Sequence, residues 1–185
     1  MSMDDIARDA GISKKTLYQY VESKEELVRR LVRQYINNEQ CMMIQIKSEA
    51  QNALVEMLKT AEFVTALFKK LNPRLLYELK KYYHESWKEV NDMHRHHIIS
   101  AIQNNIERGI EEGVYNKDVD PPIVARLYVN NALLIIDDDV FSAEEFQREQ
   151  IYHQFIRYHL RGIMSSFGLQ KLSEYMATKG KTNII

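Results

Sequence analysis

The chain has 185 residues, 45% of them hydrophobic and 28% charged, and its formal net charge is −1. This balance excludes a protein that coats DNA through an overall positive field, so a DNA-binding face would have to come from the local placement of a few lysines. Cys41 is the only cysteine, which excludes an internal disulfide and favours a reducing cytoplasm; we interpret it as a buried apolar thiol. No apolar run approaches the ~20 residues of a membrane span, so we expect no membrane partner.

Residues 2–12 predict a short helix followed by a tight turn. Ile6, Ala7 and Ala10 give this helix an inner face. Gly11 can take the positive φ that ends a helix, and the apolar residue after it is expected to fill the gap before the next element.

A second short helix is predicted to begin at Ser13, which caps it. Its Leu17 points inward, and the remaining residues leave an exposed basic and polar face. Two short helices around a glycine turn, with such a face on the second, are typical of a helix-turn-helix that enters the major groove of DNA.

The same stretch resembles the TetR family of transcriptional repressors. Four phrases occur in the family's order and at its spacing, across roughly the first 30 residues, which is more specific than a helix-turn-helix pattern alone. These phrases are Ser2-Met3-Asp4-Asp5-Ile6-Ala7, Gly11-Ile12-Ser13-Lys14, Thr16-Leu17-Tyr18-Gln19-Tyr20 and Ser23-Lys24-Glu25-Glu26-Leu27.

The chain departs from the family pattern in three places. Val21 stands where an aromatic residue is common, and Lys15 stands where glycine is common, which adds a charge near the phosphates. Family members also carry a helix before this motif that covers its back, whereas this sequence begins at the motif. We therefore expect a truncated or incompletely recorded form whose DNA-binding domain lacks its first helix and binds DNA poorly as given.

The resemblance, carried over position by position, implies a set of DNA contacts. Tyr18 and Tyr20 occupy the two tyrosine positions that reach backbone phosphates. Ser2 and Lys24 lie at helix starts, where backbone N–H groups favour a phosphate. The other residues of the second helix would meet base edges or phosphates. The predicted DNA-binding residues are Ser2, Ser13, Lys14, Lys15, Thr16, Tyr18, Gln19, Tyr20 and Lys24.

Long amphipathic helices are predicted after this motif. Ser23 and Glu26 form a capping-box pattern, and the helix that they start continues to about Ile46. Apolar residues at spacings of three and four give that helix one buried stripe. The stripe consists of Leu27, Val28, Leu31, Val32, Tyr35 and Ile36. The helices predicted next span residues 51–71, 73–82 and 84–112.

Two further helices are predicted near the C-terminus, over residues 123–136 and 143–167, the second started by a capping-box pattern at Ser142 and Glu145. The first is apolar on nearly every side and has to be covered over most of its circumference. The family resemblance implies that the last two major helices pair with those of a second copy, so we expect a homodimer through residues 121–167. The alternative is that both helices belong to the core of a monomer. Residues 179–185 are expected to be a frayed tail.

An effector pocket in the middle helices is also implied by the resemblance. Aromatic and histidine side chains with a few polar tips would suit a planar or hydrophobic molecule. The alternative is that these rings only fill the core between helices. The candidate pocket residues are Phe63, Phe68, Tyr77, Tyr83, His84, Trp87 and His97. No cysteine and histidine spacing supports zinc, so we interpret the histidines at residues 94, 96 and 97 as surface or pocket-edge groups and expect no metal and no cofactor.

The sequence as a whole predicts an all-α protein, since it has few helix breakers and no alternating strand pattern. Residues 1–45 would form the helix-turn-helix DNA-binding domain, and residues 46–185 a larger effector-binding and dimerisation domain. The predicted function is a ligand-responsive regulator, a repressor that binds operator DNA as a homodimer and is released by a small molecule. It is not expected to be an enzyme, because the chain has no phosphate loop or nucleophile motif. Two alternatives remain: a helical carrier or enzyme with a vestigial helix-turn-helix, and a helical protein-interaction bundle.

Overall fold

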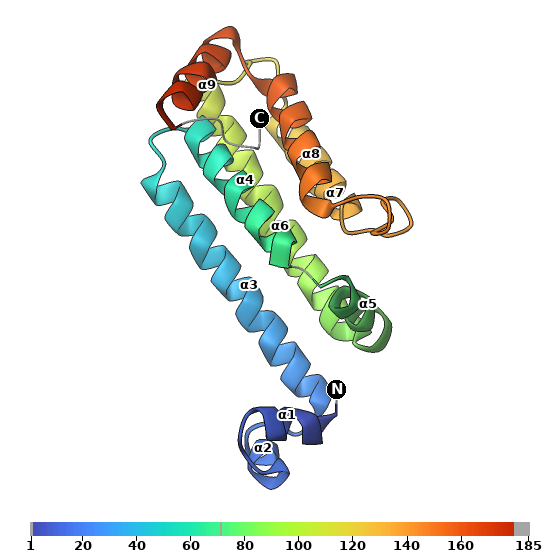
Figure 1. Cartoon of the computed structure of the whole chain (residues 1–185). Helices are drawn as coiled ribbons and strands as arrows, with labels where there is room; N and C mark the ends of the chain where they lie inside the picture. Colours follow the sequence, from blue (N-terminus) through green and yellow to red (C-terminus); the bar gives the residue numbers. More distant parts are fainter. Residues whose placement is uncertain (1, 71, 180–185) are drawn as a thin grey trace.

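The computed structural model describes residues 2–70 and 72–179, except for the side chains at 73, 90, 93, 94 and 179. Within these ranges the chain is helical, with one isolated antiparallel bridge between Tyr115 and Met164 and no strand (Figure 1). The predicted all-α fold is confirmed. The helices are α1 (Met3–Asp9), α2 (Lys14–Tyr20), α3 (Lys24–Glu49), α4 (Ala53–Lys70), α5 (Pro73–Tyr82), α6 (His84–Glu111), α7 (Pro121–Leu134), α8 (Arg148–Ile163) and α9 (Ser166–Lys179).

Helices α1 and α2 form a small unit, which we call the head, at the N-terminal end of α3 (Figure 1). Gly11 has φ 67°, as its place after α1 predicts, and the Ser13 hydroxyl accepts the Thr16 N–H at 3.0 Å to cap α2. Four buried side chains form the core of the head: Met3, Ala7, Leu17 and Val21.

The predicted inner face of the head is wrong at two positions. Ala10 and Ile12 are both exposed, Ile12 to 37%. Ala10 is the residue that ends α1, so its side chain lies at the edge of the turn rather than between the helices. Ile12 follows the turn and does not fill the gap between α1 and α2.

Helix α3 is the long connection between the head and the rest of the chain. Ser23 accepts the Glu26 N–H at 3.1 Å, but the Glu26 carboxylate accepts from the Glu22 N–H at 2.6 Å rather than from Ser23. The predicted capping box is therefore formed on one side only. A reciprocal capping box is found instead at the start of α1, between Ser2 and Asp5.

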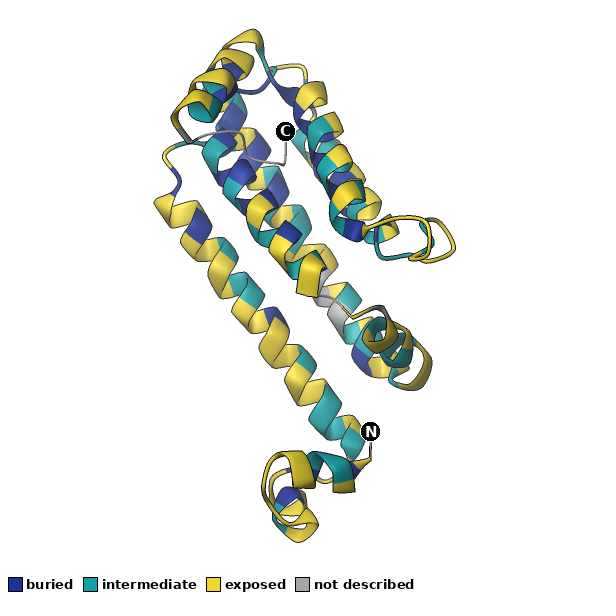
Figure 2. Cartoon of the chain, viewed as in Figure 1, coloured by how far each residue is buried: buried dark blue, intermediate teal, exposed yellow. Residues whose placement is uncertain are grey.

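The buried stripe predicted along α3 is only partly correct. Ile36 is buried, whereas Leu31 is 56% exposed and Tyr35 is 49% exposed. Beyond Leu27, which packs against the core of the head, helix α3 packs mainly on α4 and α6, so a narrow part of its circumference is covered, and Figure 2 shows exposed residues along most of its length. Cys41 is likewise exposed, which corrects its interpretation as a buried thiol.

The main core lies between α4, α6, α7 and α8 (Figure 2). Helix α4 contributes a continuous apolar face because its alanines and large aliphatic residues recur at helical spacing. Fully buried members from three of these helices include Leu54, Met57, Ile106, Ile156 and Leu160. Among the described residues, none of the helices combines the length and hydropathy that crossing a membrane requires.

The last long helix begins later than predicted. Ser142 accepts the N–H of Glu144 at 3.2 Å in a local turn, and α8 starts only at Arg148. The Arg148 guanidinium donates to the Ile135 carbonyl and to Asp138, which fastens the start of α8 to the end of α7. A side-chain bond to a distant helix end thus sets this boundary, and the local capping signal does not.

The same helix also ends earlier than predicted, at Ile163 instead of residue 167. The backbone at Met164 is extended, and the Ser165 N–H donates to the Val114 carbonyl at 3.0 Å. The Ser165 hydroxyl then accepts the Gly168 N–H at 3.0 Å and starts α9, a helix that the sequence analysis did not predict.

Candidate functional sites

Most of the residues predicted to read DNA lie on α2, Lys14–Tyr20. Lys14, Lys15 and Gln19 are exposed, and Tyr18 and Tyr20 expose 45% and 68% of their surface. Thr16 and Ser13 are engaged with each other, because their hydroxyls lie 2.8 Å apart and Ser13 caps the helix. The face predicted from the sequence is therefore accessible.

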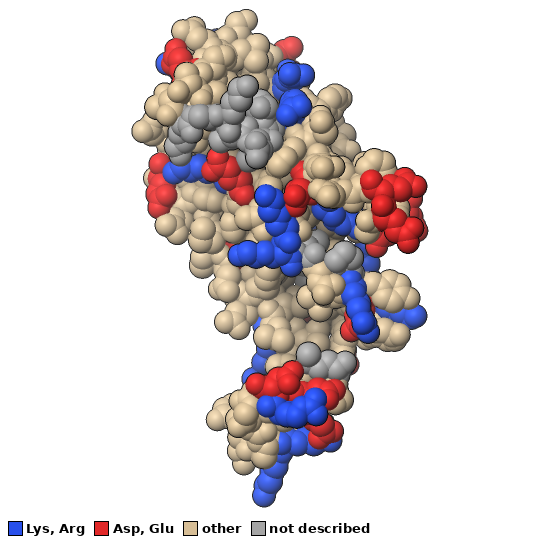
Figure 3. Space-filling model, viewed as in Figure 1, with Lys and Arg blue, Asp and Glu red and all other residues tan. Residues whose placement is uncertain are grey.

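The head carries both acidic and basic side chains, and Lys14 and Lys15 differ in whether an acidic side chain lies beside them. Figure 3 shows basic and acidic side chains interleaved on the head, with basic atoms at its outermost end. Lys14 lies 2.8 Å from Asp4, and this hydrogen bond raises the pKa of the Lys14 ammonium. Lys15 makes no ion pair with any carboxylate in the described part of the chain.

Ser2 and Lys24, the two residues predicted at helix starts, both have partners in the structure. The Ser2 hydroxyl lies 2.8 Å from the Asp5 carboxylate, and the Ser2 backbone N–H donates to the same carboxylate at 2.8 Å. These bonds lower the pKa of the Asp5 carboxyl. The Lys24 ammonium lies over the Tyr83 ring, 5.8 Å from its centroid.

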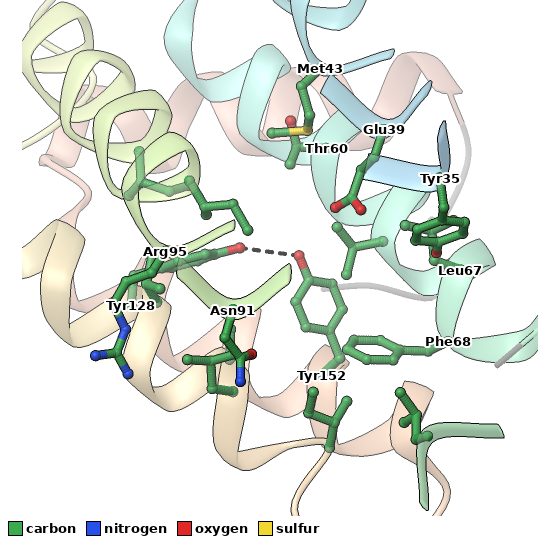
Figure 4. A pocket seen from close by; sticks show the side chains of 18 of the residues that line it. Tyr35, Glu39, Met43, Thr60, Leu67, Phe68, Asn91, Arg95, Tyr128 and Tyr152 are labelled. Atoms are coloured by element: carbon green, nitrogen blue, oxygen red, sulfur yellow. Dashed lines mark hydrogen bonds between the residues drawn. The ribbon is translucent and has the colours of Figure 1, made fainter. Parts of the chain in front are cut away.

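A cavity of about 220 Å³ lies between α3, α4, α5, α6, α7 and α8 (Figure 4). Its wall is largely apolar and aromatic, with few polar groups, which is the composition of a site for a hydrophobic small molecule. Five aromatic side chains line it: Tyr35, Phe68, Trp87, Tyr128 and Tyr152. We call this space the interior cavity.

Two of the seven candidate pocket residues, Phe68 and Trp87, line the interior cavity. Phe63 is partly exposed on α4 outside it, His84 and His97 are exposed on α6, and Tyr77 is exposed on α5. Tyr83 lies at the junction of α5 and α6 under Lys24. No group of three or more metal-ligating side chains was found among the described residues, and the side chain of His94 lies outside them.

Most residues of the cavity wall were missed by the sequence analysis. They come from separate helices, and each helix contributes only one short row. Tyr35, Glu39 and Met43 are four residues apart on α3, and Asn91 and Arg95 are four apart on α6. That spacing places each row on one helical face, but nothing in the sequence says that the two faces meet.

Two tyrosine hydroxyls are among the polar groups of the interior cavity. Those of Tyr128 on α7 and Tyr152 on α8 lie 3.1 Å apart and are hydrogen-bonded to each other (Figure 4). Burial raises the pKa of Tyr128 to about 12 and raises that of Tyr152 well above its usual value. Phe68 meets the Tyr152 ring edge-on at 5.3 Å and completes this wall.

The connection between α3 and α4 is fastened to the C-terminal part of α6. The Arg108 guanidinium donates to Glu112 at 2.7 Å, to Glu56 at 3.2 Å and to the Ala50 carbonyl at 3.2 Å. Glu112 in turn accepts the Ala53 N–H at 2.7 Å. We call this arrangement of Arg108, Glu56 and Glu112 the Arg108 clamp.

A buried tyrosine supports the Arg108 clamp. The Tyr115 hydroxyl donates to the Ala53 carbonyl at 3.3 Å or to Asn105 at 3.1 Å. The Tyr115 ring lies directly against Gly109, where a Cβ atom would come within 2.0 Å of it. A glycine is therefore required on this face of α6.

An apolar face on α7 and α8 remains uncovered in the single chain. Ile123 and Leu127 are each 57% exposed, Leu134 is 41% exposed and Tyr158 is 80% exposed. Ile123, Leu127 and Leu134 recur on one face of α7, and exposed apolar side chains in such a row are typical of an interaction surface. They belong to the segment that the sequence analysis assigned to dimerisation.

An exposed helix-turn-helix on a helical body with an interior cavity defines the class of helix-turn-helix transcriptional regulators. Residues 1–31 match the model of the bacterial regulatory proteins of the tetR family. The chain is 25% identical over 165 residues to the uncharacterized HTH-type transcriptional regulator YvaF of Bacillus subtilis, an alignment that covers 88% of this chain and 85% of that protein. The N-terminal part of the chain thus matches the tetR family model, and the chain is similar over most of its length to an HTH-type transcriptional regulator.

Solved structures share the fold. A TetR family regulator from Agrobacterium tumefaciens superimposes with a TM-score of 0.71 at 18% identity, covering 89% of this chain and 87% of that one. The regulator FadR from Bacillus subtilis, in complex with stearoyl-CoA, superimposes with a TM-score of 0.65 at 14% identity, covering 88% of this chain and 89% of that one. The ketosteroid transcriptional regulator KstR2 of Mycobacterium tuberculosis superimposes with a TM-score of 0.56 at 20% identity, covering 90% of this chain and 86% of that one.

Proposed function

We propose that this regulator is a repressor that binds operator DNA as a homodimer and is released by a small hydrophobic effector. One observation carries the proposal: α3 holds the head at one end and lines the interior cavity in its middle. A molecule that enters the cavity therefore touches the same helix that positions the DNA-binding face. As a DNA-binding protein it would act in the cytoplasm.

The DNA contacts proposed are those of the exposed face of α2 and the two helix starts beside it. Lys15, Gln19 and Tyr20 have free access to a groove or to phosphates, and Lys14 would exchange Asp4 for a phosphate. The remaining members, in capping or flanking positions, are Ser2, Ser13, Thr16, Tyr18 and Lys24.

The homodimer proposed here pairs the apolar faces of α7 and α8. A second copy would cover Leu127 and Tyr158 and remove their apolar surface from water. Two heads held at a fixed distance could then enter successive major grooves, about 34 Å apart. We propose residues 46–185 as the domain that carries both this interface and the effector site, and residues 1–45 as the DNA-binding domain.

Release would follow from a tilt of α3. The Arg108 clamp holds the C-terminal end of α3 at Ala50. Tyr35 lies about 22 Å from that end and Lys24 about 39 Å, at 1.5 Å per residue. A displacement at the cavity is therefore enlarged at the head. An effector shifts the balance only if it prefers the tilted arrangement. FadR, solved with stearoyl-CoA, supports a hydrophobic effector.

A mobility-shift titration tests this function. The protein is titrated against the DNA upstream of its own gene between 50 and 200 mM salt. We expect two protomers per shifted fragment and a binding constant that falls steeply with salt, because phosphate contacts release counterions. Absence of a shift at 50 mM salt, or a salt-independent one, would favour the carrier interpretation. Native mass spectrometry of the same preparation would reveal a co-purified effector.

A further inference from the structure

We propose that the interior cavity selects an uncharged hydrophobic molecule that carries one hydrogen-bond acceptor, such as a carbonyl oxygen, and binds it through the Tyr128 and Tyr152 hydroxyls. This inference rests on the proposed function and names the class of effector for that site. Its basis is the hydrogen-bond inventory of two buried phenols that face the cavity.

The tyrosine pair has one donor more than it can use. In the bond of 3.1 Å one hydroxyl donates and the other accepts. The accepting hydroxyl still carries its own hydrogen, and neither hydroxyl makes a further hydrogen bond with the described residues. A buried donor without an acceptor costs free energy, so an acceptor atom on a ligand is favoured at this place.

The pair stays protonated under all ordinary conditions, because burial holds the pKa of Tyr128 at about 12. The ring beside it is neutral too: His159 packs 4.8 Å from the Tyr128 ring, and burial lowers its pKa to about 4. The inner end of the cavity therefore presents donors without charge. Such a surface favours a neutral acceptor over an ion, whose desolvation nothing there would offset.

The rest of the wall limits the size and character of the molecule. Val64, Ile102 and Leu133 make the neighbouring surface apolar, and 220 Å³ exceeds the ~150 Å³ of an apolar cavity that binds benzene. Glu39 on α3 and Arg95 on α6 carry opposite charges on different sides (Figure 4), so they do not select one sign of charge. A bicyclic ketone is the size of probe that this space suggests.

The chain provides its own reporter for the test. Trp87 is the only tryptophan and lines the cavity, so its fluorescence follows occupancy. The protein is titrated with 1-tetralone and with tetralin, which differ in one carbonyl group. The measured quantity is the ratio of their dissociation constants, compared between wild type and variants, so that the different water solubility of the probes cancels.

In wild type we expect a ratio that favours the ketone, and in the double variant Tyr128→Phe/Tyr152→Phe a loss of about tenfold in that ratio. Either single variant should keep the preference, because the remaining hydroxyl still has a free hydrogen. Tetralin binding by the double variant shows that the cavity is still folded. Tyr115→Phe is the matched control, since this buried hydroxyl bonds Ala53 and Asn105 outside the cavity.

An unchanged ratio in the double variant, or no Trp87 response to either probe in wild type, overturns the inference. The mobility shift keeps the two proposals apart. If the wild-type protein binds its DNA while the ketone preference is absent, only the effector class is wrong. If the DNA shift is absent, the proposed repressor function fails whatever the probes show.

Discussion

Lys14 and Lys15 are neighbours in the sequence, yet they differ in what they can offer to DNA. Lys14 is held by Asp4 at 2.8 Å and would have to leave that carboxylate to reach a phosphate. Lys15 has no such competitor among the described residues. The charge that departs from the family pattern is therefore the more available of the two.

We expect Lys15→Ala to weaken operator binding and to reduce the slope of log Kd against log salt by about 1, the loss of one phosphate contact. The measurement is a mobility-shift titration at several salt concentrations. Lys117→Ala, an exposed lysine in the loop before α7, is the matched control and should leave the slope unchanged. Equal slopes for wild type and Lys15→Ala would remove this residue from the DNA face.

His159 makes the stability of the fold depend on pH. Its ring is buried against Tyr128 and Phe155, and burial lowers its pKa from 6.5 to about 4. The lowered value means that the unfolded chain takes up the proton first, so the stability from this group is complete above pH 6.5 and is lost as the pH falls toward 4. The difference corresponds to about 3 kcal/mol.

We therefore expect His159→Phe to lose less stability than wild type between pH 7 and pH 4.5, by up to about 3 kcal/mol. Urea denaturation at fixed protein concentration measures both profiles, and the contributions of all other groups cancel in the comparison. His84→Phe changes an exposed histidine and is the control. Parallel profiles for wild type and His159→Phe would contradict the prediction.

The residues of the head were easier to predict than those of the cavity. Gly11, Ser13 and Leu17 act through neighbours within a few positions, so their roles could be predicted from local spacing. Tyr35 and Tyr152 reach the cavity only because α3 and α8 pack around the same space, which no local pattern specifies. The tyrosine pair is likewise a product of the fold.

At the level of elements, the helices were predicted where local chemistry ends them. Pro73 and Gly113 mark boundaries that the structure places within a residue or two. The limits of α8 depend instead on distant partners: Arg148 bonds the end of α7, and Met164 pairs with Tyr115. Such boundaries could not be predicted because the competing local signal at Ser142 is satisfied by a turn.

The Arg108 clamp is the element-level feature with the clearest energetic consequence. Arg108→Met should destabilise the fold by about 2 kcal/mol, because it leaves the mostly buried Glu56 without its cation. Burial already raises the pKa of Glu56. We expect the loss to shrink as the pH falls from 7 to 5, since a raised folded pKa lets the native state take up the proton first.

Urea denaturation of a small variant set checks this expectation. Arg108→Met/Glu56→Gln should recover part of the loss, because no carboxylate is then left unpaired. Arg74→Met, which breaks an exposed pair with Glu78, should change stability by no more than about 0.5 kcal/mol. An Arg108→Met protein as stable as the Arg74→Met protein would mean that the clamp does not hold α3.

At the scale of the whole molecule, the uncovered face of α7 and α8 is what a second copy would protect. We expect Leu127→Glu to convert the proposed homodimer into a monomer, because a charge in the apolar centre of the proposed interface would be buried without a partner. Sedimentation equilibrium measures the change. Leu75→Glu alters a leucine of similar exposure on α5 and should leave the dimer intact. Dimers in both variants would exclude this face.

Helix α3 is also expected to be stiff along its whole length. Residues 24–49 contain neither glycine nor proline, so the helix has no built-in joint at which it could bend. The proposed effector site at the middle of α3 and the proposed DNA-binding head at its N-terminal end are thus joined by one stiff helix. Replacing Asn37 and Asn38 by glycines would give α3 a flexible joint. Such a variant should still bind its operator DNA and its effector. Effector binding should then no longer change DNA binding.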